Sequence, residues 1–478
     1  MRCLRLTNPA SAPACRIGVV LLFAGGLLLT GTALAQQQLT FAPLGQSTTA
    51  DIDAAGARVV FQSTADLDDG VGNADGSAEI FAVDADGANL VQLTQSALAS
   101  TQPAIAGDGS RVAFVSSADL TGGNADGGPE IFLVDASDGG NPVQVTDTGS
   151  GSGIAQPDLS ADASRIAFTA TANLTGQNGD ASRELFAVDA DGADLTQLTT
   201  GPAGTAVGFA RLQADASRVV FSSAANFAGT NGNGNSEIFL VDADGSESPV
   251  QLTDTVGGAS IRPDIADNGR IAFESTAALD ANPQGTSAVF VMDANGDNLQ
   301  ALTDAATGSA GFVRIAGDGS RVVFQATAGI NSDNPDGGPE IFIVDADGSN
   351  QTRLTDGGLA SEQPAIAGDA SQVVFQSAAN LSGNNAEGNV EIFIIDPADA
   401  GDDDDDGGNG GGVDDDSFVC DSLGSGCSFC DDDDQIAAEL VEPGDGVDQP
   451  VRAHSRARID AHVHRQQAIG LADNIGAG

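Results

Sequence analysis

Residues 111–135 begin Arg111-Val112-Ala113-Phe114, continue through a polar stretch rich in Gly and Asn, and end Glu130-Ile131-Phe132-Leu133-Val134-Asp135. This phrase recurs seven times, with one phenylalanine in its first half and one in its second. Neighbouring copies are separated by between 51 residues (324 to 375) and 54 residues (114 to 168). Such regular self-similarity indicates a repeat architecture. The paired phenylalanines are Phe61 and Phe81, Phe114 and Phe132, Phe168 and Phe186, Phe221 and Phe239, Phe273 and Phe290, Phe324 and Phe342, and Phe375 and Phe393.

Each repeat contains four short strand candidates separated by turn residues. In the second repeat these are 103–106, 111–116, 130–135 and 143–146, and the middle two are rich in β-branched and aromatic residues. Gly in the connecting turns supplies positive φ at little cost. Four antiparallel strands per repeat, over several repeats, are typical of β-propeller blades.

The two ends of the repeat region complement each other. A fourth strand resembling Gln-Leu-Thr follows each of the first six repeats, as in Gln92-Leu93-Thr94, but none follows the seventh, which runs from Gln363 to Asp396. The same phrase stands at the other end as Gln38-Leu39-Thr40-Phe41. We therefore predict an all-β fold, a seven-bladed propeller over residues 36–397, whose last blade is completed by the N-terminal strand so that no long sheet edge stays open.

The regions outside the repeats differ in composition. Residues 1–35 combine early arginines, an apolar stretch and Ala33-Leu34-Ala35, and are predicted to be a cleaved signal peptide. The mature chain is expected to be periplasmic or extracellular and not inserted in the membrane. Residues 398–416 are an Asp- and Gly-rich linker. Residues 417–478, which contain three Cys and end in a basic segment, are expected to form a disordered, low-structure tail, in which two Cys could pair locally.

The charge of the chain restricts its partners. The formal net charge is −50, with 68 acidic and 18 basic residues. An acidic surface repels phosphate backbones, so nucleic acid is not an expected partner. We expect a monomer that recognises an unidentified protein or peptide.

The repeat resembles a known family. The pattern Asp-Gly-Ser-Arg-Val-Ala-Phe (108–114), then Glu-Ile-Phe-x-Val-Asp and Gln-Leu-Thr, is similar to the WD-repeat-like propeller repeat of TolB-type proteins. The resemblance covers residues 38–396 and implies a protein-binding or scaffold propeller. TolB itself has six blades and an additional N-terminal domain, whereas seven repeats are counted here. Similar repeats also occur in propellers of peptidases and pectin lyases.

Several kinds of catalysis are excluded by composition. Residues 38–396 contain no His, Cys or Lys, so Ser-His-Asp triads, ordinary zinc sites and Schiff-base chemistry are ruled out there. Paired carboxylates remain possible. We therefore predict a non-enzymatic binding module. The alternatives are a carbohydrate-active lyase or hydrolase with carboxylates at the channel mouth, or a Ca²⁺-stabilised surface protein.

The loop between the second and third strands of each repeat is rich in oxygen ligands. Its Asn, Asp and Glu residues alternate as in Ca²⁺ loops, although they also suit ordinary tight turns. No cofactor is expected other than possible Ca²⁺. The candidate Ca²⁺ ligands are Asn124, Asp126, Glu130, Asn178, Asp180 and Glu184.

Arginine and aspartate recur as a pair at the ends of the second and third strands. Arg111 and Asp135 in the second repeat are one example, and five other repeats have the same pair. A hairpin of this length places the two residues opposite each other, which predicts cross-strand ion pairs with a structural role.

Overall fold

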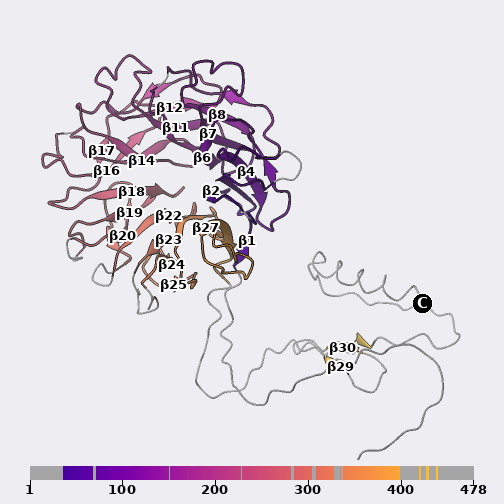
Figure 1. The fold of residues 1–478 in the computed structure, drawn as a ribbon. Helices are drawn as coiled ribbons and strands as arrows, with labels where there is room; N and C mark the ends of the chain where they lie inside the picture. Colours follow the sequence, from indigo (N-terminus) through magenta and orange to yellow (C-terminus); the bar gives the residue numbers. More distant parts are fainter. Residues whose placement is uncertain are drawn as a thin grey trace, which may run out of the picture. The chain divides into compact units, whose positions relative to one another are not determined.

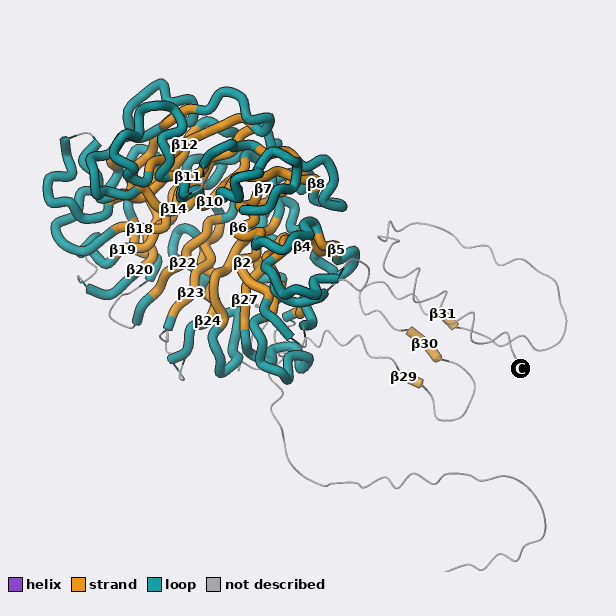
Figure 2. Tube along the Cα trace, turned by 45° about the horizontal axis from the view of Figure 1, so that its top comes forward, coloured by secondary structure: helices purple, strands orange, loops and turns teal. Residues whose placement is uncertain are grey.

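The chain folds into seven four-stranded antiparallel sheets arranged around a common centre (Figure 1). This computed structural model describes residues 36–398 except 43, 68–71, 150, 228, 281–284, 304–307, 328–333 and 335–336, and also the backbone of 419–420, 427–429 and 438–439. The described residues form no helix (Figure 2). The predicted seven-bladed propeller of four-stranded blades is confirmed.

The strands of each blade follow one another from the centre outward. The innermost strands are β2 (Ser47–Ile52), β6 (Ser100–Ile105), β10 (Ala155–Leu159), β14 (Val207–Leu212), β18 (Ser260–Ile265), β22 (Ala310–Ile315) and β26 (Ser361–Ile366). The second strands are β3 (Arg58–Ser63), β7 (Arg111–Ser116), β11 (Arg165–Ala170), β15 (Arg218–Ser223), β19 (Arg270–Ser275), β23 (Arg321–Ala326) and β27 (Val373–Ser377). The third strands are β4 (Glu79–Asp84), β8 (Glu130–Asp135), β12 (Glu184–Asp189), β16 (Glu237–Asp242), β20 (Ala288–Asp293), β24 (Glu340–Asp345) and β28 (Glu391–Ile395). The outer strands are β5 (Val91–Gln92), β9 (Val143–Gln144), β13 (Thr196–Gln197), β17 (Val250–Gln251), β21 (Gln300–Ala301), β25 (Thr352–Arg353) and β1 (Gln37–Gln38).

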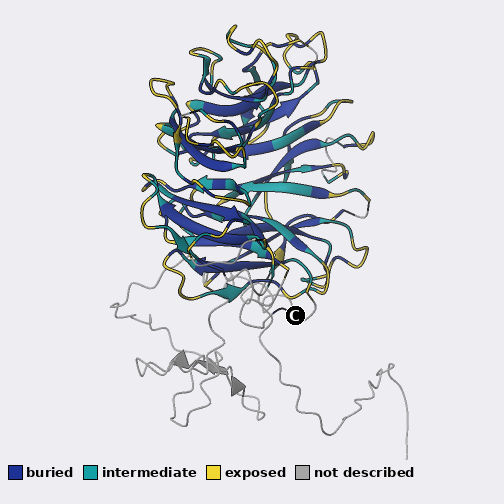
Figure 3. Ribbon diagram, turned by 90° about the vertical axis from the view of Figure 1, so that its left-hand side faces the viewer, coloured by how far each residue is buried: buried dark blue, intermediate teal, exposed yellow. Residues whose placement is uncertain are grey.

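The recurring phenylalanines form the centre of each blade. The second and third strands pair so that the two phenylalanines of a repeat lie opposite each other, as Phe114 and Phe132 do. Their rings stack with centroids 6.0 Å apart in that blade, and the other blades repeat the arrangement. Both faces of the two middle strands are buried, since each packs against a neighbouring blade (Figure 3). Aromatic pairs in this geometry add about 0.5–1.5 kcal/mol to the burial of their area.

The N-terminal strand closes the ring. β1 pairs with β28, with Gln38 opposite Phe393, so the seventh sheet has the order β1-β28-β27-β26. The predicted closure is confirmed, although the regular strand is Gln37–Gln38 and shares only Gln38 with the predicted phrase 38–41. Leu39 continues the pairing through its backbone N–H to Ile392 (2.8 Å) and packs in the apolar cluster shared by the first and last blades.

The repeated arginine–aspartate pairs lie in the expected register, with Arg111 opposite Asp135 and the other five pairs likewise. Four pairs form ion pairs, among them Arg111 Nε to Asp135 Oδ1 at 3.1 Å. The guanidinium of Arg270 instead donates to the carbonyl of Ala346 in the next blade (2.6 Å). Partly exposed pairs of this kind contribute about 0–1 kcal/mol each, so the aromatic core outweighs them.

The chain divides into two units, residues 1–404 and 405–478. In the second unit, the described backbone forms a small sheet of β29 (Val419–Cys420), β30 (Cys427–Phe429) and β31 (Ala438–Glu439), in which Cys420 lies opposite Cys427. The predicted signal peptide, nearly all of the linker and most of the tail lie outside the described residues. No helix among the described residues is long and apolar enough to cross a membrane.

Candidate functional site

A β-bulge interrupts each of the seven inner strands at the same position. The residue in each bulge has a positive φ of 49° to 57° although none is glycine. Non-glycine residues adopt this conformation at a cost of about 1–2 kcal/mol, and bulges redirect side chains, often near functional sites. The seven bulge residues are Thr49, Gln102, Gln156, Phe209, Arg262, Phe312 and Gln363.

Side chains from neighbouring blades accept hydrogen bonds from the backbone N–H groups of six of these bulge residues. The N–H of Gln156 donates to Gln102 Oε1 (2.7 Å), and the N–H of Phe209 donates to Gln156 Oε1 (3.1 Å). Elsewhere the acceptor lies on a second strand, as for the N–H of Phe312, which donates to Glu274 Oε2 (2.9 Å). Bonds of this kind connect neighbouring blades at six of the seven bulges, all except that of Arg262.

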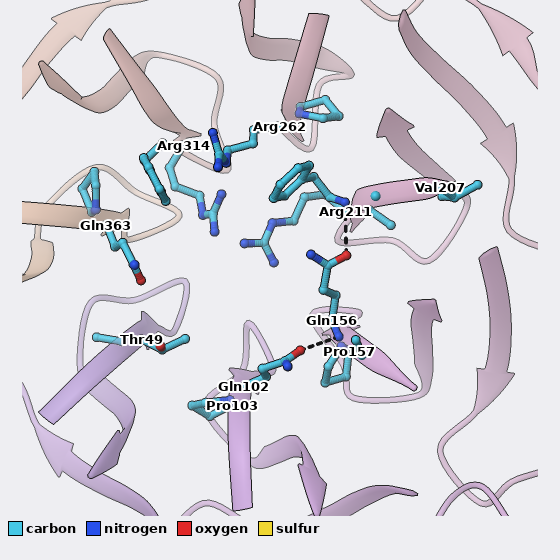
Figure 4. A pocket seen from close by; sticks show the side chains of 18 of the residues that line it. Thr49, Gln102, Pro103, Gln156, Pro157, Val207, Arg211, Arg262, Arg314 and Gln363 are labelled. Carbon is cyan, nitrogen blue, oxygen red and sulfur yellow. Dashed lines mark hydrogen bonds between the residues drawn. The ribbon is translucent and has the colours of Figure 1, made fainter. Parts of the chain in front are cut away.

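The bulges surround a cavity of about 550 Å³ within the ring of inner strands (Figure 4). All seven inner strands contribute to its lining, together with Arg183 from the loop that precedes β12. The lining includes four arginines, three bulge glutamines, two phenylalanines and four prolines, and no carboxylate residue. Pockets of this volume accommodate ligands the size of a short peptide or a cofactor fragment.

Arg262 is held between two aromatic rings. Its guanidinium lies 4.6 Å from the ring centre of Phe209 and 4.2 Å from that of Phe312, which belong to the blades on either side. It also forms an ion pair with the buried Glu274. Burial raises the pKa of Glu274, and the guanidinium of Arg262 acts against that rise. Stacking and pairing together hold this arginine rigidly at the wall of the pocket.

A second row of charged residues lies two positions after the bulges. Asp158 Oδ1 lies 3.1 Å from the nearest nitrogen of Arg211, and Asp264 Oδ1 lies 3.9 Å from Arg211 Nε. Asp51 accepts a bond from the N–H of Ile105 in the next blade (3.0 Å).

Burial raises the pKa of both Asp51 and Asp264 to about 6, although Arg211 acts in the opposite direction. Burial also opposes the charge of Arg211, but the carboxylates of Asp158, Asp264 and Asp51 outweigh it and raise the pKa of the guanidinium. One pocket-lining arginine therefore balances three aspartates that are not part of the lining.

None of the candidate Ca²⁺ ligands lines this cavity. Four lie in the loops between second and third strands, and Glu130 and Glu184 are the first residues of the third strands β8 and β12. Glu130 is buried and accepts hydrogen bonds from the hydroxyls of Thr146 (2.5 Å) and Thr148 (2.6 Å). Burial raises its pKa, and the two hydroxyls act against the rise. The carboxylate of Glu184 similarly accepts from Thr199 (2.5 Å). These glutamates join the third strand to the segment that follows the outer strand, a structural role that recurs around the ring.

In the third blade the three candidate oxygens converge on one hydroxyl. Ser182 Oγ lies 2.7 Å from Asp180 Oδ1, 2.7 Å from Glu184 Oε1 and 3.3 Å from Asn178 Oδ1. The second blade has Gly128 at the matching position. There Asp126 caps the N–H of Gly128 (3.0 Å), and no described group donates to the buried Oδ1 of Asn124. Within the described residues, no three His, Cys, Asp or Glu residues form a group suited to a metal.

This difference makes Gly128→Ser an informative substitution. A serine hydroxyl can donate to Asn124 as Ser182 does to Asn178, so we expect a gain in stability of about 1 kcal/mol, visible as a higher melting temperature. Melting with Ca²⁺ and with chelator tests the candidate ligands in the same pair of proteins. Stabilisation of the parent chain by Ca²⁺ but not by Mg²⁺, lost in Gly128→Ser, would assign Ca²⁺ to this loop. An unchanged or lower melting temperature of Gly128→Ser without metal would contradict the expected gain.

The sequence did not predict the residues that line the pocket or the charged residues two positions after the bulges. The relevant signal lies in the inner strands, where the residue after the recurring proline changes from blade to blade: Asp158 follows Pro157, Asp264 follows Pro263, but Ala104 follows Pro103. Positions that vary inside an otherwise regular repeat are the ones free to form a single site. The predicted repeat phrase lies in the second and third strands. Those strands form the buried core of each blade, whereas the inner strands line the pocket.

Comparison with known proteins agrees with the fold. No family model matches the chain, and no curated protein matches it in sequence. Among solved structures, an oligogalacturonate lyase from Vibrio parahaemolyticus has a TM-score of 0.55 and 14% identity over 77% of this chain and 94% of its own. An oligogalacturonate lyase in complex with manganese has a TM-score of 0.51 at 13% identity, covering 76% and 96%. TolB from Acinetobacter baumannii has a TM-score of 0.40 at 20% identity, covering 67% and 66%.

At these identities the similarity to the lyases establishes the fold alone. Together with the seven confirmed sheets, it defines the class of this protein as a seven-bladed β-propeller. The fold alone does not identify functional residues, because the same fold carries many activities.

Proposed function

We propose that this chain is an exported, non-enzymatic binding module of TolB-like character, which recognises a protein or peptide segment through the pocket at its centre. The observation that carries the proposal is the lining of that pocket. Arginine, glutamine, phenylalanine and proline side chains hold a ligand by charge, hydrogen bonds and packing. Apart from the hydroxyl of Thr49, the lining side chains offer no ordinary nucleophile or general acid and base at neutral pH.

The rigidity of the site supports the same function. The bulge backbone is tied to neighbouring blades, and protein groups alone stack against Arg262 and pair with it. A preorganised site loses little side-chain entropy on binding, which favours recognition of a flexible segment.

Photo-cross-linking tests this proposal. We expect p-benzoylphenylalanine in place of Gln363, which lines the pocket, to trap a protein or peptide when the chain is produced with its export signal. The matched control carries the same residue at Val256, which is 90% exposed and lies outside the pocket lining. Adducts identified by mass spectrometry that depend on position 363 would support the proposal. Their absence at position 363, or an equal set from both positions, would overturn it.

A second candidate function is a carbohydrate-active enzyme that uses channel carboxylates. The observation in its favour is the raised pKa of Asp51 and Asp264, since a carboxyl group with a pKa of about 6 can act as a general acid. Neither residue belongs to the pocket lining, and both accept hydrogen bonds from the backbone of the next blade. Depolymerisation of acidic or neutral polysaccharides by the parent chain, abolished in Asp264→Asn, would favour the enzyme over the binding module.

A further inference from the structure

The pocket concentrates positive charge in a strongly acidic protein. Four of the 18 basic residues line this one cavity, while the chain as a whole has a net charge of −50. Two of the four are compensated locally, because Arg211 pairs with Asp158 and Arg262 pairs with Glu274.

Arg183 and Arg314 are not compensated in this way. Arg183 donates to the carbonyl of Gly153 (2.9 Å) and the hydroxyl of Thr169 (3.1 Å), and Arg314 donates to the carbonyl of Val313 (3.2 Å). Among the described residues, neither forms an ion pair with a carboxylate. A guanidinium has five N–H donors, so both keep donors and a full positive charge available to a ligand.

The side chains of Arg211 and Arg314 extend toward the middle of the pocket (Figure 4). A guanidinium fork matches the two oxygens of a carboxylate better than any other common side chain does. The lining arginines therefore favour a planar anion over a neutral ligand.

The charge of the whole molecule limits what kind of anion can enter. The field of the many acidic groups repels a ligand that carries several negative charges. A ligand with a single carboxylate on an otherwise neutral body meets much less repulsion on its way to the arginines. Phe209, Phe312 and the lining prolines provide apolar surface for the rest of such a ligand.

We propose that the pocket binds a peptide carboxylate, with Arg314 as its principal partner and Arg183 as a second source of positive charge. This inference rests on the proposed binding function and names the group that the site recognises. A C-terminus and an acidic side chain supply the same chemistry, so the experiment includes both.

Isothermal titration of the chain from residue 36 onward tests the proposal at neutral pH. The probes are N-acetyl-trialanine with a free carboxylate, the same tripeptide amidated, amidated N-acetyl-Ala-Glu-Ala, and inorganic phosphate, each at up to about 10 mM, above the Kd range of weak ligands. We expect one or both carboxylate peptides to bind, with affinity about tenfold lower in Arg314→Gln, and no binding of the neutral tripeptide. The preferred peptide identifies a C-terminus or a side chain as the source.

Two further variants keep the result interpretable. Arg321→Gln removes an arginine that pairs with Asp345 outside the pocket lining, and it is expected to bind like the parent chain. Arg314→Lys keeps the charge without the planar fork and is expected to bind with intermediate affinity. Equal melting temperatures of the variants show that each is folded.

Four results would overturn the proposal: no binding of any peptide probe, equal binding of the amidated tripeptide, parental affinity in Arg314→Gln, or phosphate bound as tightly as the peptides with the same dependence on Arg314. The last would mark a general anion site. Cross-linking at position 363 does not require a carboxylate, so the binding function would survive if adducts formed there while the carboxylate preference failed.

Discussion

Removal of residues 36–41 is expected to unfold the propeller at physiological temperature. The deletion takes away Leu39 and Thr40, which are 3% and 0% exposed, and with them the hydrogen bonds that join β1 to β28. The hydroxyl of Thr40 donates to the buried Glu391 and accepts from the N–H of Ile392 (2.9 Å). Without this segment, Glu391 loses its hydroxyl donor.

The expected loss has two parts. Removing a buried leucine costs about 2–5 kcal/mol, and leaving a buried charged group without its partner adds about 1–3 kcal/mol or more. Their sum is comparable to the whole stability of a typical domain, which is about 5–15 kcal/mol. The opened seventh blade would also expose a strand edge to other chains.

Circular dichroism with thermal melting measures the effect. The matched control ends at Ala398 and keeps all 28 propeller strands, so we expect it to melt close to the full chain. A synthetic peptide of residues 36–42 added to the deleted chain is expected to restore part of the transition, since it can pair with β28. A deletion variant that melted within a few degrees of the control would show that the ring does not depend on this strand.

The fold could be predicted because every repeat contains the same pattern of strand and turn residues. The phenylalanines of the second and third strands recur at matched positions, and the missing outer strand of the seventh repeat reappears as Gln38-Leu39-Thr40. Sequence and structure agree here since the propeller core is a property of each repeat, and seven copies make the pattern visible.

The site could not be predicted in the same way. It depends on bulges that turn Phe209, Arg262 and Phe312 toward one another across three blades, although about 50 residues separate each from the next. A bulge leaves no clear mark in the sequence, because none of its seven positive-φ residues is glycine. The proximity of Arg211 to Asp158 and Asp264 likewise follows from the circular arrangement of the blades and not from any local motif.

Asp51 and Asp264 are expected to destabilise the folded chain as pH rises. Asp51 and Asp264 have a folded pKa of about 6 against an ordinary value of 3.8, because burial disfavours their charged forms. Between these two values the folded state binds more protons than the unfolded state. The contribution of these residues to the free energy of unfolding therefore falls from pH 4 to pH 6 and is constant above that window. One pKa unit corresponds to about 1.4 kcal/mol, so each residue accounts for up to about 3 kcal/mol.

Substitution by asparagine isolates this contribution from that of the many other carboxylates. Asn keeps an oxygen for the N–H of Ile105 or Ile315, which the two aspartates accept in the parent chain. We expect Asp51→Asn and Asp264→Asn to match the parent near pH 4 in urea unfolding, and to exceed it in stability increasingly up to about pH 7, where the difference levels off. The double variant should gain less than the sum, since both residues interact with Arg211.

Asp162→Asn serves as a control of opposite sign. The hydroxyls of Ser164 and Ser160 lower the pKa of Asp162, so its charged form stabilises the fold above the ordinary pKa, and the variant is expected to lose stability relative to the parent as pH rises. Parallel profiles of stability against pH for Asp51→Asn, Asp264→Asn and the parent chain would contradict the raised pKa of Asp51 and Asp264. A profile that diverges in the expected direction only for Asp264→Asn would place the unfavourable charge beside Arg211 and Asp158, and would leave Asp51 as an ordinary, hydrated carboxylate.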